Sequence, residues 1–246
     1  MTLHLNVTVA SNPYQKLLDR KRKWTPVQTT AGKLKEGAEE AIFRALAMRH
    51  MELPVGEFIE AAISEIPVLS QDLLRSNIKD EENHDLALGY IANALGVDPK
   101  AEEEAKRLRS AWEAHPDHTV LKALVAERAI FFVLLPFFRF NGDAGLRTVS
   151  ADISRDEQVH VAANSLVCRE LGYEPSASLD KLRKATINWV VTPLKSSTDK
   201  YLDKKFWLDA SDRLMYEGKA PELSDTKRAR MPAFFEHANP NLPQYA

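Results

Sequence analysis

Two segments of this chain carry one short signature, Asp80-Glu81-Glu82-Asn83-His84 and Asp156-Glu157-Gln158-Val159-His160. In each, a glutamate precedes a histidine by three residues. Residues three apart lie on one face of an α-helix, so each signature points a carboxylate and an imidazole in the same direction. Oxygen and nitrogen ligands of this kind suit a first-row transition metal.

The sequences that follow the two signatures also match in character. Both are helical patterns rich in small and apolar residues, and they end at Gly96 and Gly172, each twelve residues after its histidine. Glycine in this position is typical of a helix C-terminus. The match indicates a duplicated pair of helices, so we expect a second carboxylate from the helix before each signature.

In the second half the choice of that carboxylate is narrow. The helix predicted over residues 119–139 is apolar nearly all round and contains one acidic residue, Glu127. A buried carboxylate without a partner is costly. Gly142, in a predicted turn, lies midway between Glu127 and Glu157, so two antiparallel helices joined there would bring both carboxylates to one height. The alternative is that Glu127 pairs with an arginine.

In the first half two glutamates remain open. Glu52 precedes Glu81 by 29 residues, close to the spacing in the second half. It falls within the apolar stripe if the helix continues through a kink at Pro54. Glu39 lies on the flank of that stripe. We favour Glu52, and the sequence leaves the choice open.

Composition predicts a helical, globular chain. Of 246 residues, 44% are apolar and 28% charged, and only 13 are proline and 9 glycine, which favours helix. A net charge of −2 gives no basis for nucleic-acid binding. The single cysteine, Cys168, excludes an internal disulfide and a cysteine-ligated metal cluster. No signal peptide or membrane-spanning run is apparent, so we expect a cytoplasmic protein without a membrane partner.

We expect a single domain over residues 1–246. Residues 2–9 alternate polar and apolar side chains, as in a short strand or an extended arm. Helical patterns then follow, at about 32–66 with an interruption at Pro54, at 70–95, 98–117, 119–139, from the 141–143 turn to 171, at 179–192 and at 196–217, with a last short helix after 224.

The chain resembles the ferritin-like di-iron carboxylate superfamily, and within it the ribonucleotide reductase small subunit, the acyl-carrier-protein desaturases and related oxidases. The two signatures and Glu127 carry the resemblance, which covers about residues 36–172. Four carboxylates and two histidines inside a helical bundle are the ligand set of such sites. The resemblance implies an all-α, ferritin-like four-helix bundle with additional N- and C-terminal helices. The bundle core would span about 36–172 and a C-terminal helical extension 179–237.

The resemblance also implies a composition for the site. It would hold two iron ions, or one manganese and one iron. A ligating imidazole usually donates its second N–H to a carboxylate. In the family that the chain resembles, such an aspartate often contacts the histidine of the opposite half, so we pair Asp156 with His84 and Asp80 with His160. The expected metal ligands are Glu52, Glu81, His84, Glu127, Glu157 and His160, and the expected lining of an apolar O2 pocket is Leu88, Phe131 and Leu135.

The leading functional hypothesis is an O2-activating oxidoreductase or oxygenase that oxidises an organic substrate or a protein side chain. It would draw on an electron donor such as a ferredoxin or a reductase, and it would form a homodimer. The second hypothesis is a radical-generating subunit like that of ribonucleotide reductase, with Trp24 or Tyr90 in electron transfer. Leu88 stands where that subunit carries its radical tyrosine, which counts against this role. The third is a non-catalytic helical interaction protein whose signatures are chance surface pairs.

Overall fold

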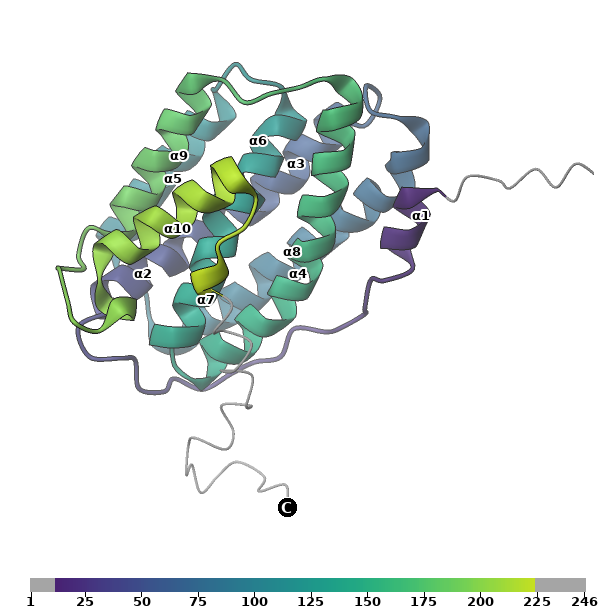
Figure 1. Ribbon diagram of the computed structural model, residues 1–246. Coiled ribbons are helices and arrows are strands. Elements are labelled where there is room, and N and C mark those ends of the chain that lie inside the picture. Colours follow the sequence, from purple (N-terminus) through teal and green to yellow (C-terminus); the bar gives the residue numbers. More distant parts are fainter. Residues whose placement is uncertain (1–11, 224–246) are drawn as a thin grey trace, which may run out of the picture.

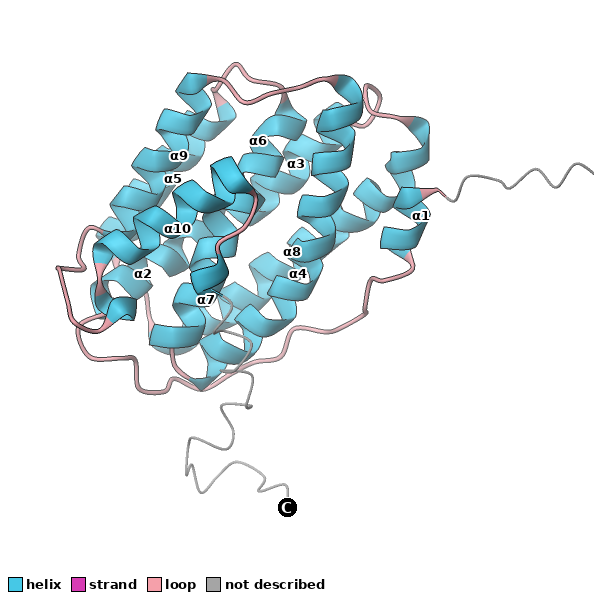
Figure 2. Ribbon diagram, viewed as in Figure 1, coloured by secondary structure: helices cyan, strands magenta, loops and turns pink. Residues whose placement is uncertain are grey.

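The structure, a computed structural model, describes residues 12–223. Every regular element within that range is a helix (Figures 1 and 2), so the predicted all-α class is confirmed. The predicted strand at 2–9 and the predicted helix after 224 lie outside the described residues. Among residues 12–223, no helix is both long and apolar enough to cross a membrane.

The segment that carries the candidate ligand Glu52 consists of α2 (Glu39–Ala47), the 3₁₀ turn η1 (Met48–Met51) and α3 (Glu52–Ala62). The predicted kink at Pro54 is wrong, because the interruption is η1, which comes earlier. Pro54 lies in the first turn of α3, where a backbone N–H has no acceptor within the helix, so proline is tolerated there. The predicted helix also starts too early. Gly37 has a φ of +84°, a left-handed conformation that an α-helix cannot include.

The 3₁₀ turn η2 (Val68–Ser70) leads into the long helix α4 (Gln71–Leu95), which carries the first signature. This helix ends at Gly96, as predicted, where φ is +85°. Asp98 then accepts a hydrogen bond from the Lys100 N–H at 2.9 Å and caps α5 (Pro99–Glu113).

The segment that carries the candidate ligand Glu127 is interrupted in a different way. The helix predicted over 119–139 is α6 (Thr119–Ala126), the π-helical turn η3 (Glu127–Phe131) and α7 (Phe132–Asn141). The π-turn is absent from the sequence prediction. The turn at 141–143 is present, and Asp143 caps α8 (Ala144–Leu171), which carries the second signature, by accepting from the Leu146 N–H at 2.9 Å.

The helices that carry the signatures lie side by side in the middle of the molecule (Figure 1). Helix α3 packs against α4 and α6, and α8 packs against α4, α6 and α7. The short helix α1 (Pro13–Leu18) contacts α4 and α8, while α9 (Ala177–Val191) contacts α2. Helix α10 (Lys204–Glu217) lies across η3 and α7.

The C-terminal helices differ from the prediction at one boundary. Helix α9 matches the pattern at 179–192, but α10 begins at Lys204 rather than at residue 196. Residues 196–203 form a loop that contains the short turn η4 (Lys200–Leu202). Asp203 ends this loop and caps α10 by accepting from the Lys205 N–H at 3.1 Å.

Candidate metal centre

The two signatures and the two preceding glutamates meet in the interior between α3, α4, α6–η3 and α8. Their side chains offer ligand atoms that lie within 4.8 Å of one another in two overlapping groups. Every member is buried. The first group is Glu52, Glu81, His84 and Glu157, and the second is Glu81, Glu127 and His160. All six residues predicted as metal ligands therefore lie in one cluster that could hold metal ions.

His84 faces the cluster through Nδ1. This nitrogen lies 3.2 Å from a Glu81 oxygen, 3.5 Å from a Glu157 oxygen and 3.6 Å from Glu52 Oε2. The other ring nitrogen, Nε2, lies 3.3 Å from Asp156 Oδ2. An Nε2–H that donates to Asp156 leaves the Nδ1 lone pair directed at the cluster.

His160 repeats this arrangement in the second half. Its Nδ1 lies 3.0 Å from Glu81 Oε1 and 3.8 Å from both Glu127 Oε1 and Glu157 Oε2. Its Nε2 lies 2.9 Å from Asp80 Oδ2. Each histidine thus contacts the aspartate of the opposite half, which is the crossed arrangement that the resemblance implies.

Glu81 and Glu157 stand between the two halves. One oxygen of each faces His84 and the other faces His160. Glu52 contacts only His84 of the two histidines, and Glu127 only His160. The geometry therefore distinguishes two shared carboxylates from two that belong to one half each.

Several ligand atoms of the cluster are buried without a hydrogen-bond partner. Buried polar atoms in proteins are nearly always paired, so a convergent group of unpaired ones indicates a missing partner. Acceptor oxygens and an imidazole nitrogen with no sulfur among them suit a borderline transition metal. The atoms are Glu52 Oε2, Glu81 Oε1, Glu127 Oε1, both Glu157 oxygens and His160 Nδ1. Of these, Glu81 Oε1 and His160 Nδ1 lie 3.0 Å apart as an ion pair, without the geometry of a hydrogen bond. The residues present thus fit a metal pair.

Burial and mutual charge shift the acidity of these groups strongly. Burial raises the pKa of Glu52 and of Glu127 to about 8, and it also raises the pKa of Glu157 well above its usual value. Burial would raise the pKa of Glu81 as well, but His160 and His84 outweigh it and hold that pKa at about 2. Without metal, Glu81 is thus the anion of the cluster.

The pKa values of the two histidines are raised as well, but from a different cause. Burial alone would lower their pKa, but Asp156 and Glu52 beside His84, and Glu81 and Asp80 beside His160, raise it well above the usual value. Raised pKa values favour the doubly protonated, positively charged form of both imidazoles in the metal-free chain. Metal ions must displace these protons, which couples their binding to pH.

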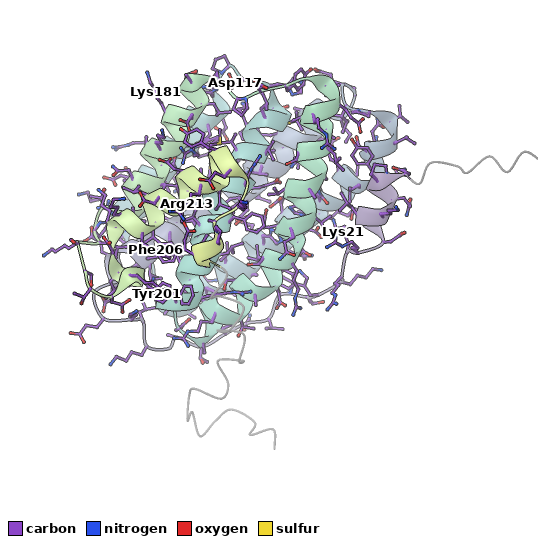
Figure 3. All side chains as sticks on the ribbon, in the orientation of Figure 1. Lys21, Asp117, Lys181, Tyr201, Phe206 and Arg213 are labelled. Atoms are coloured by element: carbon purple, nitrogen blue, oxygen red, sulfur yellow. The ribbon has the colours of Figure 1, made fainter. Side chains whose placement is uncertain are left out.

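The two aspartates behind the histidines have different outer partners. Trp24 donates its indole N–H to Asp156 Oδ2 at 2.6 Å, and its ring stacks 6.2 Å from that of His84. Lys21 forms an ion pair with Asp80 and donates to Asn77 Oδ1 at 2.9 Å. Burial would raise the pKa of Asp80, but His160 and Lys21 outweigh it and lower that pKa. Figure 3 labels Lys21 on the segment that follows α1.

Sequence reasoning missed the roles of Lys21 and Asn164. The amide of Asn164 donates to Glu127 Oε2 at 2.7 Å, and both side chains are fully buried. Asn164 follows His160 by four residues, so helical spacing could have placed it on the ligand face. Lys21 lies in an irregular segment, where periodicity carries no such signal.

The structure distinguishes between the alternatives that the sequence left open for Glu52 and Glu127. Glu39 is exposed at the start of α2 and accepts from the Gly37 N–H at 2.8 Å, so Glu52 and not Glu39 joins the cluster. The contacts of Glu127 are with Asn164 and His160, not the arginine pairing considered as its alternative. The predicted pocket residues Leu88, Phe131 and Leu135 are all buried, and their role as a pocket stays a prediction.

Comparison with known proteins gave no match, whether to family models, to curated proteins or to solved structures.

Proposed function

We propose that this protein is a non-haem dinuclear metal oxidoreductase that activates O2. One observation carries the proposal. Four glutamates and two histidines converge inside a helical chain, and six of their buried oxygen and nitrogen atoms have no hydrogen-bond partner. Burying so many ionisable groups is costly unless they bind something of opposite charge.

The arrangement of helices supports a ferritin-like bundle as the scaffold. Each half supplies a helix pair, α3–α4 and α6–α8, and each pair carries one glutamate on its first helix and one signature on its second. This is the ligand pattern of di-iron carboxylate bundles. We propose two iron ions, or one manganese and one iron, as the resident metals.

A bound metal pair would supply the electrons that O2 activation needs. The chain itself orients and protects the site. Asp156 and Asp80 hold the Nε2 protons of His84 and His160, which keeps both Nδ1 atoms aimed inward. The buried side chains of Leu88, Phe131 and Leu135 belong to the apolar core and would exclude water from an O2 pocket.

The proposal includes partners. Repeated turnover needs electrons from outside, so we expect a donor such as a ferredoxin or a reductase. The substrate would be an organic molecule or a protein side chain, and the protein would act as a cytoplasmic homodimer.

Metal analysis tests the proposal. Protein loaded anaerobically with ferrous iron should retain about two equivalents, and the His160→Ala variant should lose at least one of them. Glu39→Ala is a matched control, because Glu39 is an exposed glutamate outside the cluster. The loaded protein should then consume O2. A fully folded wild-type protein that retains no metal would reject the proposal and favour a non-catalytic helical interaction protein.

One observation favours a second candidate, a radical-generating subunit that serves a partner enzyme. Trp24, Asp156 and His84 form a continuous hydrogen-bonded series from a partly exposed indole to the cluster. Such a series could pass an electron between the surface and the metals. Electron paramagnetic resonance after O2 exposure separates the candidates. A long-lived organic radical would favour the second, and its absence with an oxidised substrate would favour the first.

A further inference from the structure

The π-helical turn η3 begins at Glu127, and the residues that follow Glu127 are bonded to the C-terminal helix α10. The Arg128 guanidinium donates through Nε to the Leu214 carbonyl at 2.9 Å. The Ser211 hydroxyl donates to the Ala129 carbonyl at 2.7 Å. Helix α10 is therefore hydrogen-bonded to both residues that directly follow Glu127.

The contacting positions on α10 form one face. Ser211, Leu214 and Gly218 follow the helical spacing of three and four residues. Gly218 ends α10 with a φ of +70°, and a Cβ atom added there would collide with the Arg128 guanidinium. This end of α10 is thus fitted closely to the turn. Figure 1 shows α10 lying across this part of the molecule.

The direction of the Ser211 hydrogen bond is fixed by its other partner. Arg183 donates through Nη1 to Ser211 Oγ at 2.7 Å, and a guanidinium can only donate. The single hydroxyl proton of Ser211 must therefore go to Ala129. Arg183 is itself held by Asp180 at 2.6 Å and Asp212 at 2.7 Å, and both Arg183 and Ser211 are 1% exposed.

A π-turn needs such support more than an α-helix does. Its bonds span five residues, as when the Phe132 N–H donates to the Glu127 carbonyl, and isolated π-turns are rare because that geometry is unfavourable. The turn fixes the direction in which Glu127 leaves the helix. Glu52, its counterpart in the first half, is the first residue of a regular α-helix.

We propose that Ser211 is a positioning residue for the metal centre. Through Ala129 it holds the π-turn in the register that aims Glu127 Oε1 at His160. The inference rests on the proposed function, because it assigns Ser211 to the half of the centre formed by Glu127 and His160. It also gives α10 a role in metal binding, although none of the candidate ligands lies on α10.

Cobalt(II) titration tests the proposal, with the visible d–d spectrum and the metal stoichiometry as readouts. In Ser211→Ala the second equivalent should bind about 10- to 100-fold more weakly, as for other residues that orient metal ligands, while the first binds as in wild type. Trp207→Phe is the matched control. Trp207 is a buried α10 residue whose indole bonds the Tyr201 carbonyl at 3.0 Å, so its loss weakens α10 without removing the Ser211 or Arg128 bonds to the turn. Circular dichroism verifies folding.

If Ser211→Ala does not fold, Arg128→Met tests the same support through the bond to Leu214. Selective loss of the second equivalent in either variant, with both retained in Trp207→Phe, supports the role. Two equivalents with the wild-type spectrum in both Ser211→Ala and Arg128→Met would overturn it and leave the proposed function standing. Equal loss in Trp207→Phe would also overturn it, because general docking of α10 would then explain the effect. A wild-type protein that binds no cobalt would reject both proposals.

Discussion

The two halves of the cluster carry the same ligand types on different local structures. In the first half, Glu52 begins a regular helix directly after a 3₁₀ turn. In the second, Glu127 lies in a π-turn that α10 supports. The same carboxylate position is thus reached from a helix end in one half and from a distorted helix interior in the other.

The surroundings of the ligands differ as well. The residue four positions after the histidine is the apolar Leu88 in the first half. In the second half it is Asn164, which donates a hydrogen bond to Glu127. Asp156 accepts from the neutral indole of Trp24, whereas Asp80 pairs with the cation of Lys21. A repeated motif therefore need not give equivalent sites. We expect two metal positions with different affinities.

The largest effect should come from the carboxylates that both halves share. Glu81 is the anion between the two imidazoles in the metal-free chain, whereas burial raises the pKa of Glu157 and so favours its protonated form. Glu81→Gln should therefore cost the metal-free protein about 3–5 kcal/mol, because it removes the buried negative charge that both imidazoles contact through Nδ1. Glu157→Gln replaces a neutral carboxyl by a neutral amide of the same shape and should cost less than about 1 kcal/mol.

Both variants should nevertheless fail to retain two metal equivalents. Urea unfolding of the metal-free proteins, together with metal analysis of the loaded ones, measures the two effects separately. Equal stability losses in the two variants would contradict the assignment of the anion to Glu81.

The pH dependence of stability should reverse when metal is bound. Glu52 and Glu127 have a pKa of about 8 in the folded chain, raised from an ordinary value of 4.5. A raised pKa contributes stability that is fully present below the unfolded value and is lost as pH rises through the folded value. The metal-free protein should therefore lose stability steadily between pH 5 and pH 8. Bound metal replaces these protons, so the metal-loaded protein should be more stable at pH 8 than at pH 5. Thermal unfolding at both pH values, with and without metal, provides the measurement, and a metal-free protein more stable at pH 8 would argue against it.

Asn164→Leu should make the second half resemble the first. It removes the hydrogen bond to Glu127 at 2.7 Å and should cost about 1–3 kcal/mol, because a buried acceptor loses its donor. Binding of the second metal should weaken more than binding of the first. Leu88→Met serves as the control, since a volume-conserving apolar change should cost less than about 1.5 kcal/mol. If both substitutions weaken the same equivalent equally, the distinction between the halves is lost.

Trp24→Phe should have the smallest effect on stability. It removes one hydrogen bond, from the indole to Asp156 at 2.6 Å, and keeps an aromatic ring beside His84, so a cost of about 0.5–1.5 kcal/mol is expected. Metal content should stay at two equivalents. If Trp24 conducts electrons, reduction of the oxidised centre by an external donor should slow markedly in stopped-flow measurements. An unchanged rate would remove Trp24 from the electron route.

Much of the site could be predicted from the sequence because helical spacing is regular. The three-residue step within each signature and the turn at Gly142 were enough to bring Glu81, His84, Glu157, His160 and Glu127 to one place. The all-α class followed from composition and pattern. The choice of Glu52 over Glu39 needed the structure, because it depends on where the first segment leaves the α-helical path.

The parts that the sequence did not predict depend on contacts between distant segments. The π-turn at Glu127 has no periodic signal, and α10 supports it through Ser211, which lies 82 residues after Ala129 along the chain. Lys21 and Trp24 come from an irregular segment, so pattern could not place them beside the two aspartates. Pro54 misled the prediction, since a proline in the first turn of a helix does not break it.

Anomalous diffraction from crystals grown with manganese(II) or iron(II) would show whether both halves build one dinuclear centre. The account predicts two peaks in the interior, one among Glu52, Glu81, His84 and Glu157 and the other among Glu81, Glu127 and His160. A single peak, two peaks that share no carboxylate, or metal only at the surface would contradict it.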